Sequence, residues 1–193
     1  MKALVVVCHP EPESFTRAVL DSVTKGLVAS GHDVDLIDLY ADEFEPKISE
    51  DEWNIVSAGG LLESTADHAR RLSAADMLVL VYPTLWSAQP AMLKGWFERV
   101  FINGVAYSVT PSGTLQPALT NISKVMVATS HGSTKLINML EGEAGKLMAQ
   151  RTLRTVFGWR TKVTWVALYD IDRASDAKRT AFLARVGQAA RRL

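Results

Sequence analysis

Residues 77–101 read MLVLVYPTLWSAQPAMLKGWFERVF, in which an apolar run, a short loop and a helical pattern follow one another directly. The run Met77–Val81 is short and aliphatic, which is typical of a strand that is buried on both faces. Pro90 suits the first position of a helix, where a missing N–H costs nothing. Apolar residues then recur at helical spacing, as Met92, Trp96 and Val100. This stretch predicts a parallel strand that is followed by its crossover helix.

Similar strand and helix patterns lie on both sides of this stretch. The other predicted strands are Lys2–Cys8, Asp33–Leu39, Lys124–Thr129 and Lys162–Leu168. The predicted helices are Ser14–Ser30, Ser64–Leu72, a stretch interrupted by Gly142 and Gly145 that ends near Phe157, and a last helix capped by Ser175. We expect residues 41–53 to form an exposed connection and residues 104–121 to form a long functional loop.

Five strands that alternate with helices predict an α/β fold. Parallel strands need long right-handed crossovers, so the helices should cover both faces of a parallel sheet. The natural strand order is 2-1-3-4-5, in which ligands bind beyond the carboxyl ends of the strands. A length of 193 residues with 48% hydrophobic residues predicts a single domain over residues 1–193.

Composition narrows the range of partners and of cellular locations. Lysine plus arginine equals aspartate plus glutamate at 21 each, so no overall field attracts nucleic acid or an anionic membrane. The apolar runs are too short to span a bilayer, and we expect no membrane insertion. One cysteine, Cys8, cannot form an internal disulfide, and no leader pattern precedes the first strand. We therefore expect a cytoplasmic protein.

The segment Pro83–Phe101 resembles the corresponding stretch of the NAD(P)H:quinone oxidoreductases, the DT-diaphorase type of flavin-dependent reductase. In that family a proline, two variable residues and a tryptophan precede a proline-led helix, and Pro83, Trp86 and Pro90 reproduce the spacing. The resemblance runs from Lys2 to about Thr134 and implies a flavodoxin-like, doubly wound sheet of five parallel strands. It also implies a bound flavin and NAD(P)H as the electron donor.

The first strand-to-helix loop, residues 9–17, has the features of a phosphate site. A helix begins there, so free backbone N–H groups and the hydroxyls of Ser14 and Thr16 converge at its N-terminus. Ser14 could instead serve only as a helix N-cap. The family resemblance implies that His9, Ser14, Phe15 and Thr16 hold the flavin phosphate, and that Arg17 adds charge.

The loop after the third strand carries Trp86 to the rim of the sheet, where an indole can form a wall for a flat ring. A core tryptophan that caps the sheet is an equally good interpretation of the residue alone. The resemblance implies that the loop residues Pro83, Thr84, Leu85, Trp86 and Ser87 bind the flavin, and that Trp86 also shapes the catalytic pocket.

The loop after the fourth strand reads Thr129-Ser130-His131-Gly132 and should reach the same rim. The matching family loop is glycine-rich and faces the flavin ring, so the resemblance implies that these four residues contact the flavin. Ser130 and His131 stand where the family has glycines. The family tyrosine and histidine that assist charge handling have no counterpart here, and we expect His131 to take their catalytic role. An exposed loop histidine is the alternative. With one strand between them, His9 and His131 should lie roughly 10 Å apart, which is poor for a shared metal. We expect no metal site.

Two further features bear on substrate and assembly. The element around Tyr107 resembles a family motif whose tyrosine lines the quinone pocket, often from the other subunit of a homodimer, although Tyr107 could equally be a loop anchor. A basic set at positions 146–162 is most simply a solvated face, and one member could meet a phosphate of the nicotinamide cofactor. Cys8 reads as a buried small hydrophobe.

Together these features imply a flavin-dependent NAD(P)H oxidoreductase that reduces quinones or similar small molecules. In such a mechanism the donor passes hydride to the flavin and leaves, and the acceptor then collects it in the same pocket. FMN is favoured over FAD, because the connection after Asp42 is short. The alternatives are a flavin-bound regulatory subunit of a potassium efflux transporter and a small electron carrier. The glycine motifs of dehydrogenases and nucleotide hydrolases are absent.

Overall fold

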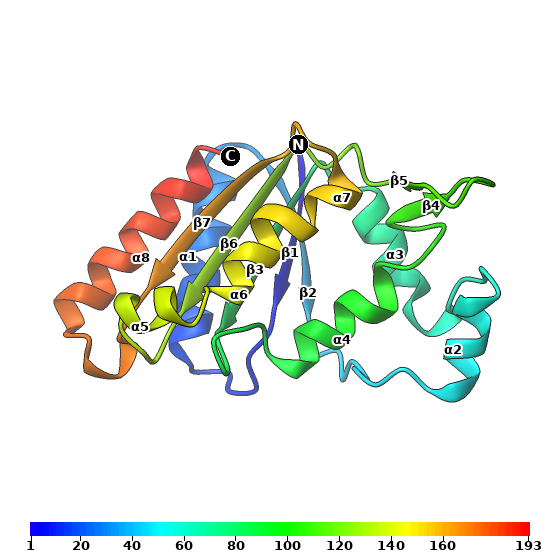
Figure 1. The fold of residues 1–193 in the computed structure, drawn as a ribbon. Helices are drawn as coiled ribbons and strands as arrows, with labels where there is room; N and C mark the ends of the chain where they lie inside the picture. The colour runs from blue at the N-terminus through cyan, green and yellow to red at the C-terminus, as the bar shows by residue number, and fades with distance from the viewer.

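Five parallel strands form the centre of the computed structural model, which describes residues 1–193 (Figure 1). They are β1 (Lys2–Val7), β2 (Asp33–Asp38), β3 (Met77–Pro83), β6 (Lys124–Ser130) and β7 (Lys162–Leu168). Their order across the sheet is β2-β1-β3-β6-β7, which confirms the predicted order 2-1-3-4-5. Every pairing is parallel. The carboxyl ends of all five strands therefore lie at one rim.

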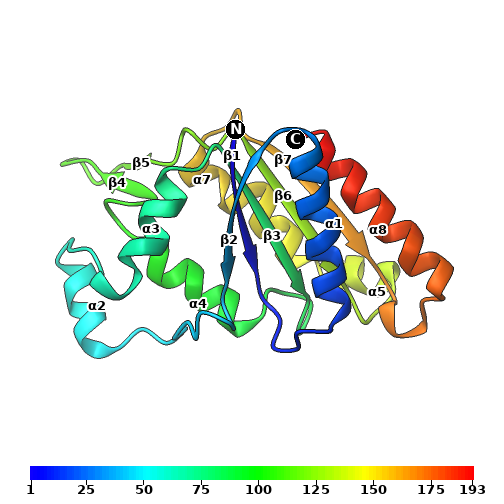
Figure 2. The same ribbon diagram turned by 180° about the vertical axis from the view of Figure 1, so that it is seen from behind.

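Helices cover both faces of this sheet, as the crossovers require. One face carries α1 (Phe15–Ala29) and α8 (Asp176–Arg191), which lie side by side (Figure 2). The other face carries α3 (Ala66–Ser73), α4 (Ala91–Val100), α6 (Ala144–Leu147) and α7 (Arg154–Phe157). Alternate residues along each strand enter the two cores: Leu4 and Val6 face α4, whereas Val5 and Val7 face α1.

The interrupted helical stretch predicted before Phe157 is confirmed as several short pieces. Before α6 lies α5 (Lys135–Leu140), and a π-helical turn, η2 (Met148–Thr152), joins α6 to α7. Short 3₁₀ turns, η1 (Glu63–Thr65) and η3 (Ile171–Arg173), precede α3 and α8. No helix combines the length and the hydrophobicity that a membrane crossing would require.

Three local predictions need correction. The connection predicted over residues 41–53 contains the start of a helix, α2 (Glu50–Ser57), because Ser49 and Glu52 form a reciprocal capping box. The loop predicted over residues 104–121 holds a small antiparallel pair, β4 (Tyr107–Val109) and β5 (Leu115–Pro117). Pro90 is the N-cap residue, with extended backbone, and α4 begins one residue later.

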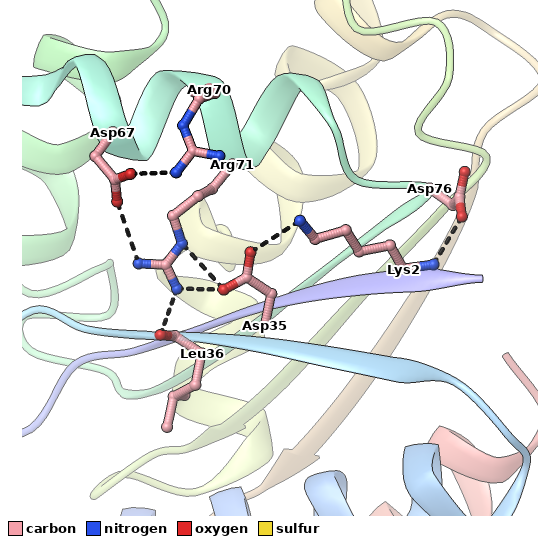
Figure 3. A network of polar contacts seen from close by, with 7 residues as sticks. All are labelled: Lys2, Asp35, Leu36, Asp67, Arg70, Arg71 and Asp76. Carbon is pink, nitrogen blue, oxygen red and sulfur yellow. Dashed lines mark hydrogen bonds and ion pairs between the residues drawn. The ribbon is translucent and has the colours of Figure 1, made fainter.

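A network of charged side chains fastens the edge strand β2 to its neighbours (Figure 3). The Nε of Arg71, on α3, donates to Oδ1 of Asp35 at 3.0 Å. The Nζ of Lys2, on β1, lies 3.3 Å from Oδ2 of the same carboxylate. Arg71 also reaches Asp67 on its own helix. Asp35 therefore joins three elements through one side chain.

Candidate functional site

Three loops at the carboxyl rim of the sheet carry most of the side chains predicted to form the site. They follow β1, β3 and β6, the three adjacent strands in the centre of the sheet. The backbone N–H of Thr84 donates to the carbonyl of Ser130 at 2.8 Å, so the loops after β3 and β6 are joined directly. The strand order thus brings together residues that are more than one hundred positions apart in the chain.

Ser14 occupies the N-cap position of α1, yet its side chain makes no capping hydrogen bond. Its Oγ is buried and has no partner in the protein. The backbone N–H groups of Phe15 and Thr16, in the first turn, also have no acceptor. The interpretation of Ser14 as a simple N-cap is therefore wrong. These unpaired donors at a helix N-terminus are arranged for an anion.

The other polar residues of this first loop bind the loop itself. The backbone N–H of Glu11 donates to Nδ1 of His9 at 3.0 Å. Arg17 forms an ion pair with Asp38, at the end of β2, and donates to the carbonyl of His9 at 3.4 Å. The guanidinium of Arg17 therefore links the first loop to the end of β2.

Trp86 lies at the tip of a tight turn and is fully exposed, at 102% of its reference surface. Trp86 and Ser87 both have positive φ, +50° and +58°, and Leu85 and Ala88 exchange two hydrogen bonds of 3.1 Å around them. The interpretation of Trp86 as a core tryptophan is wrong. The N–H groups of Trp86 and Ser87 have no acceptor in the protein.

Left-handed backbone at two successive residues with side chains costs free energy, of order 1–3 kcal/mol for each residue. A tryptophan in this region is a particular outlier, because bulky residues rarely adopt it. The hydroxyl of Ser87 donates to the carboxylate of Glu141, and this contact joins the turn to the C-terminal end of α5. Strained backbone that the surroundings hold in place is characteristic of ligand sites.

His131 is buried, with 2% of its surface exposed, so the interpretation as an exposed loop histidine is wrong. Its Nδ1 lies 3.2 Å from Oγ1 of Thr84, and its Nε2 is buried without a partner. Burial lowers the pKa of His131, and the nearby Asn138, Glu143 and Glu141 only partly oppose this effect. The imidazole is therefore neutral at neutral pH.

Tyr169 is the residue of this site that reasoning from the sequence missed. Its ring stacks on His131, with centroids 4.6 Å apart and an interplanar angle of 16°. Its hydroxyl donates to Oε1 of Glu143 at 2.7 Å, and Glu143 pairs with Lys146 at 2.7 Å. Burial, together with Glu143, raises the pKa of Tyr169 to about 12. A signal was present, because Tyr169 directly follows β7 and so reaches the same rim.

Tyr107 is not brought to the rim within one chain. It begins β4, which lies with β5 apart from the five-stranded sheet and beside α3 (Figure 1). Its ring lines a separate apolar cleft of about 480 Å³ with Phe101, Met148 and Leu153. The structure therefore separates Tyr107 from Trp86 and His131, the other two residues predicted to be catalytic.

Cys8 lies directly after β1 and is buried, with 1% of its surface exposed. Burial raises the pKa of its thiol to about 12, so the sulfur stays protonated at neutral pH. Its interpretation as a buried small hydrophobe is confirmed. No three His, Cys, Asp or Glu side chains are grouped so that they could hold a metal ion.

Comparisons with known proteins agree with this architecture. NAD(P)H dehydrogenase [quinone] 1 of Cavia porcellus is 30% identical over 155 residues, which are 72% of this chain and 56% of that protein. The chain thus spans little more than half the length of this relative. The structure of an FMN-dependent NADH-azoreductase from Bacillus anthracis in complex with FMN superposes over 99% of the chain and 98% of its own length. Its TM-score is 0.77 at 16% identity, a likeness in fold alone.

A second solved structure is similar in sequence as well as in fold. The NAD(P)H:quinone oxidoreductase from Methanothermobacter marburgensis is 32% identical, with a TM-score of 0.86, over 99% of this chain and 98% of that one. The sequence profile of one family, described as a flavodoxin-like fold, matches residues 1–193. The chain therefore belongs to the flavodoxin-like family, in which it groups with the NAD(P)H:quinone oxidoreductases.

Proposed function

We propose that this protein is a flavin-dependent oxidoreductase that transfers electrons from NAD(P)H to quinones or similar flat acceptors. One observation carries the proposal: two sets of unpaired hydrogen-bond donors lie at one rim of the sheet. The first set surrounds the buried Oγ of Ser14. The second is the turn at Trp86, whose indole has no protein neighbour to cover it. A cofactor with an anionic tail and a flat polar ring would satisfy both sets.

The loop after β1 suits the phosphate of a flavin. In this proposal the N–H groups of Phe15 and Thr16 and the hydroxyl of Ser14 donate to the phosphate, and His9 closes the loop beside them. A phosphate at a helix N-terminus also gains from the helix dipole. The contact between Arg17 and the carbonyl of His9 holds the loop in place for this task.

The loops after β3 and β6 suit the ring of the flavin. Pro83, Thr84 and Leu85 lead into the turn, where the N–H groups of Trp86 and Ser87 are available to polar atoms of the ring. On the other side, Thr129, Ser130, His131 and Gly132 would face the ring end at which negative charge develops on reduction. The buried, unpaired Oγ1 of Thr129 is consistent with this placement.

A bound flavin supplies the redox chemistry, since it accepts a hydride from the nicotinamide donor and passes it on to the acceptor. The protein aligns the reactants and stabilises charge. The Trp86 indole would form one wall of the pocket that donor and acceptor use in turn. His131, held neutral by burial and fixed by Thr84 and Tyr169, would hydrogen-bond through its unpaired Nε2. Overall, NAD(P)H, a proton and a quinone give NAD(P)⁺ and a hydroquinone.

FMN is the flavin that we propose. FAD carries an additional adenosine, which needs a surface to wrap against. The segment between β2 and α2 is short, and most of its backbone N–H groups already have acceptors within the protein. One structural relative, an FMN-dependent azoreductase, carries FMN on the same fold.

The decisive experiment is an absorbance spectrum of the protein loaded with FMN, followed by anaerobic titration with NADPH and then with benzoquinone. We expect the flavin band to disappear at one equivalent of NADPH in a single step and to return at one equivalent of benzoquinone. A protein that binds no FMN would contradict the proposal. Loss of the band in two separate one-electron stages would instead support a small electron carrier.

A further inference from the structure

A positively charged cleft lies along the open edge of the sheet, next to the candidate site. It has a volume of about 420 Å³ and is bordered by β7, α5, α6 and α8. Because β7 is the last strand in the order, its outer edge has no neighbouring strand. The cleft is open to solvent along this edge.

All charged side chains that line this cleft are basic. Lys135, Lys146 and Arg185 line it, and no aspartate or glutamate does. Lys146 is neutralised by Glu143, at 2.7 Å. Lys135 is exposed and has no acidic partner, and Arg185 donates only to the carbonyl of Ala167, at 2.7 Å. Two cations therefore remain uncompensated and face one space, which favours an anionic ligand.

Protection of the sheet edge accounts for only part of this arrangement. Basic side chains often bind the outward carbonyls of an edge strand and so block pairing with another chain. Arg185 does so at Ala167, and Lys178 binds the carbonyl of Tyr169, the residue directly after the strand, at 3.1 Å. Lys135 lies on α5 and contacts no carbonyl of β7, so edge protection does not explain its place in the cleft.

Two aromatic side chains connect the cleft with the candidate site. Trp165 and Tyr169 form part of its wall. Tyr169 also stacks on His131, so a single ring separates the cleft from the loop after β6. A long ligand seated at the rim can therefore extend past Tyr169 into the cleft. Aromatic walls and nearby cations suit a phosphorylated base.

We infer that this cleft binds the phosphorylated adenosine end of the nicotinamide donor, with Lys135 and Arg185 contacting its phosphate. This inference rests on the proposed function, because it assigns the donor of that same site. A further consequence concerns the choice of donor. NADPH carries one more phosphate than NADH, so the protein should prefer NADPH, and the preference should weaken as salt screens the two cations.

Calorimetric titration of the FMN-loaded protein tests the cleft without turnover, with 2′,5′-ADP and 5′-AMP as probes. We expect 2′,5′-ADP to bind more tightly at low salt. Lys135→Gln and Arg185→Gln should each weaken its binding by up to about fivefold, the scale of an exposed ion pair. Lys25→Gln, which removes an exposed lysine of α1, is the matched control and should change nothing. Lys135 makes no contact that supports the fold, so its variant remains informative if Arg185→Gln unfolds.

Equal binding of the two probes, or undiminished binding of 2′,5′-ADP to Lys135→Gln, would overturn the inference. Flavin reduction by NADPH and by NADH distinguishes this failure from failure of the proposed function. If both donors reduce the flavin equally well while 2′,5′-ADP does not bind, the oxidoreductase remains and the cleft is not its donor site. If neither donor reduces the flavin, the proposed function itself fails.

Discussion

Trp86 combines a strained backbone with a fully exposed indole. Both features lower the stability of the protein without a ligand, so we expect the indole to contribute to function. Trp86→Gly should raise the free energy of unfolding by about 1 kcal/mol, because glycine adopts positive φ without strain. The same change should lower quinone turnover severely and leave FMN affinity nearly unchanged. Chemical denaturation and steady-state kinetics measure the two effects. Trp86→Ala separates them, since it removes the indole and keeps the strain. Equal stability of the two variants would show that the turn is unstrained.

Ser14 should matter for the cofactor and not for the helix that it begins. Its Oγ caps no backbone N–H, so Ser14→Ala should leave the stability of the flavin-free protein unchanged. FMN affinity should fall by about tenfold, the loss of one hydrogen bond to a charged group. Ser175→Ala is the matched comparison, because Ser175 accepts from the N–H of Lys178 at 3.3 Å and truly caps α8.

The two serine variants should therefore show opposite effects. Ser175→Ala should cost about 1 kcal/mol of stability and leave FMN affinity intact. Fluorescence titration with FMN and thermal denaturation are sufficient measurements. If Ser14→Ala destabilised the protein and retained FMN, the assignment of the phosphate loop would be wrong.

At the scale of the elements, α1 and α8 pack closely against each other at two glycines. A Cβ at Gly26 would lie 2.5 Å from the carbonyl oxygen of Gly187 and 2.8 Å from Cβ of Ala190. Gly26→Ala should destabilise the protein by about 1–3 kcal/mol, because the helices must move apart. Gly187→Ala is the control, since its Cβ would meet the carbonyl oxygen of Ser22 at an ordinary 3.4 Å. That variant should be neutral or slightly stabilising, through its better helix propensity. Equal losses in both variants would contradict the close packing.

The charged network on β2 should make stability depend on pH (Figure 3). Burial alone would raise the pKa of Asp35, but Arg71 and Lys2 outweigh it, and the pKa lies below its ordinary value of 3.8. A carboxyl whose pKa is lowered by folding stabilises the folded protein fully at pH values above its ordinary pKa. This stabilisation is lost as the pH falls through the folded-state pKa.

Asp35→Asn should thus cost about 2 kcal/mol at pH 7 and less at pH 3, which lies below the ordinary pKa of the carboxyl. Denaturant unfolding at the two pH values measures this difference. Asp21→Asn, at an exposed position of α1 outside any ion pair, should have little effect at either pH. A loss for Asp35→Asn that does not change with pH would show that the network contributes packing and not charge.

For the whole molecule, the separation of Tyr107 from the rim bears on assembly. We predict a homodimer in which Tyr107 of one subunit reaches the pocket of the other. The mass of one chain is 21.2 kDa, and light scattering after gel filtration should give twice this mass. Tyr107→Ala should weaken quinone turnover and keep FMN bound. A fully active monomer would exclude a shared site.

Much of the fold follows from the sequence alone. The five strands, their order and the loops that end at one rim are encoded in local patterns. Apolar runs of strand length and helical periodicity at Met92, Trp96 and Val100 report backbone structure over a few neighbouring residues. Chirality and the need for crossovers then restrict the topology. The same local reasoning misplaced the start of α4 by one residue, at Pro90, and missed the short helix α2, which a capping box at Ser49 and Glu52 initiates.

Only the tertiary structure decided how the site residues are used. Ser14 resembles any N-cap serine and Trp86 any core tryptophan until the neighbouring segments are in place. His131 is buried because Tyr169, almost forty residues later, stacks against it. Burial and hydrogen-bond satisfaction depend on contacts between distant parts of the chain, so no local pattern reports them. For the same reason, the cations of the β7 cleft, on three separate helices, became a single site only in the folded protein.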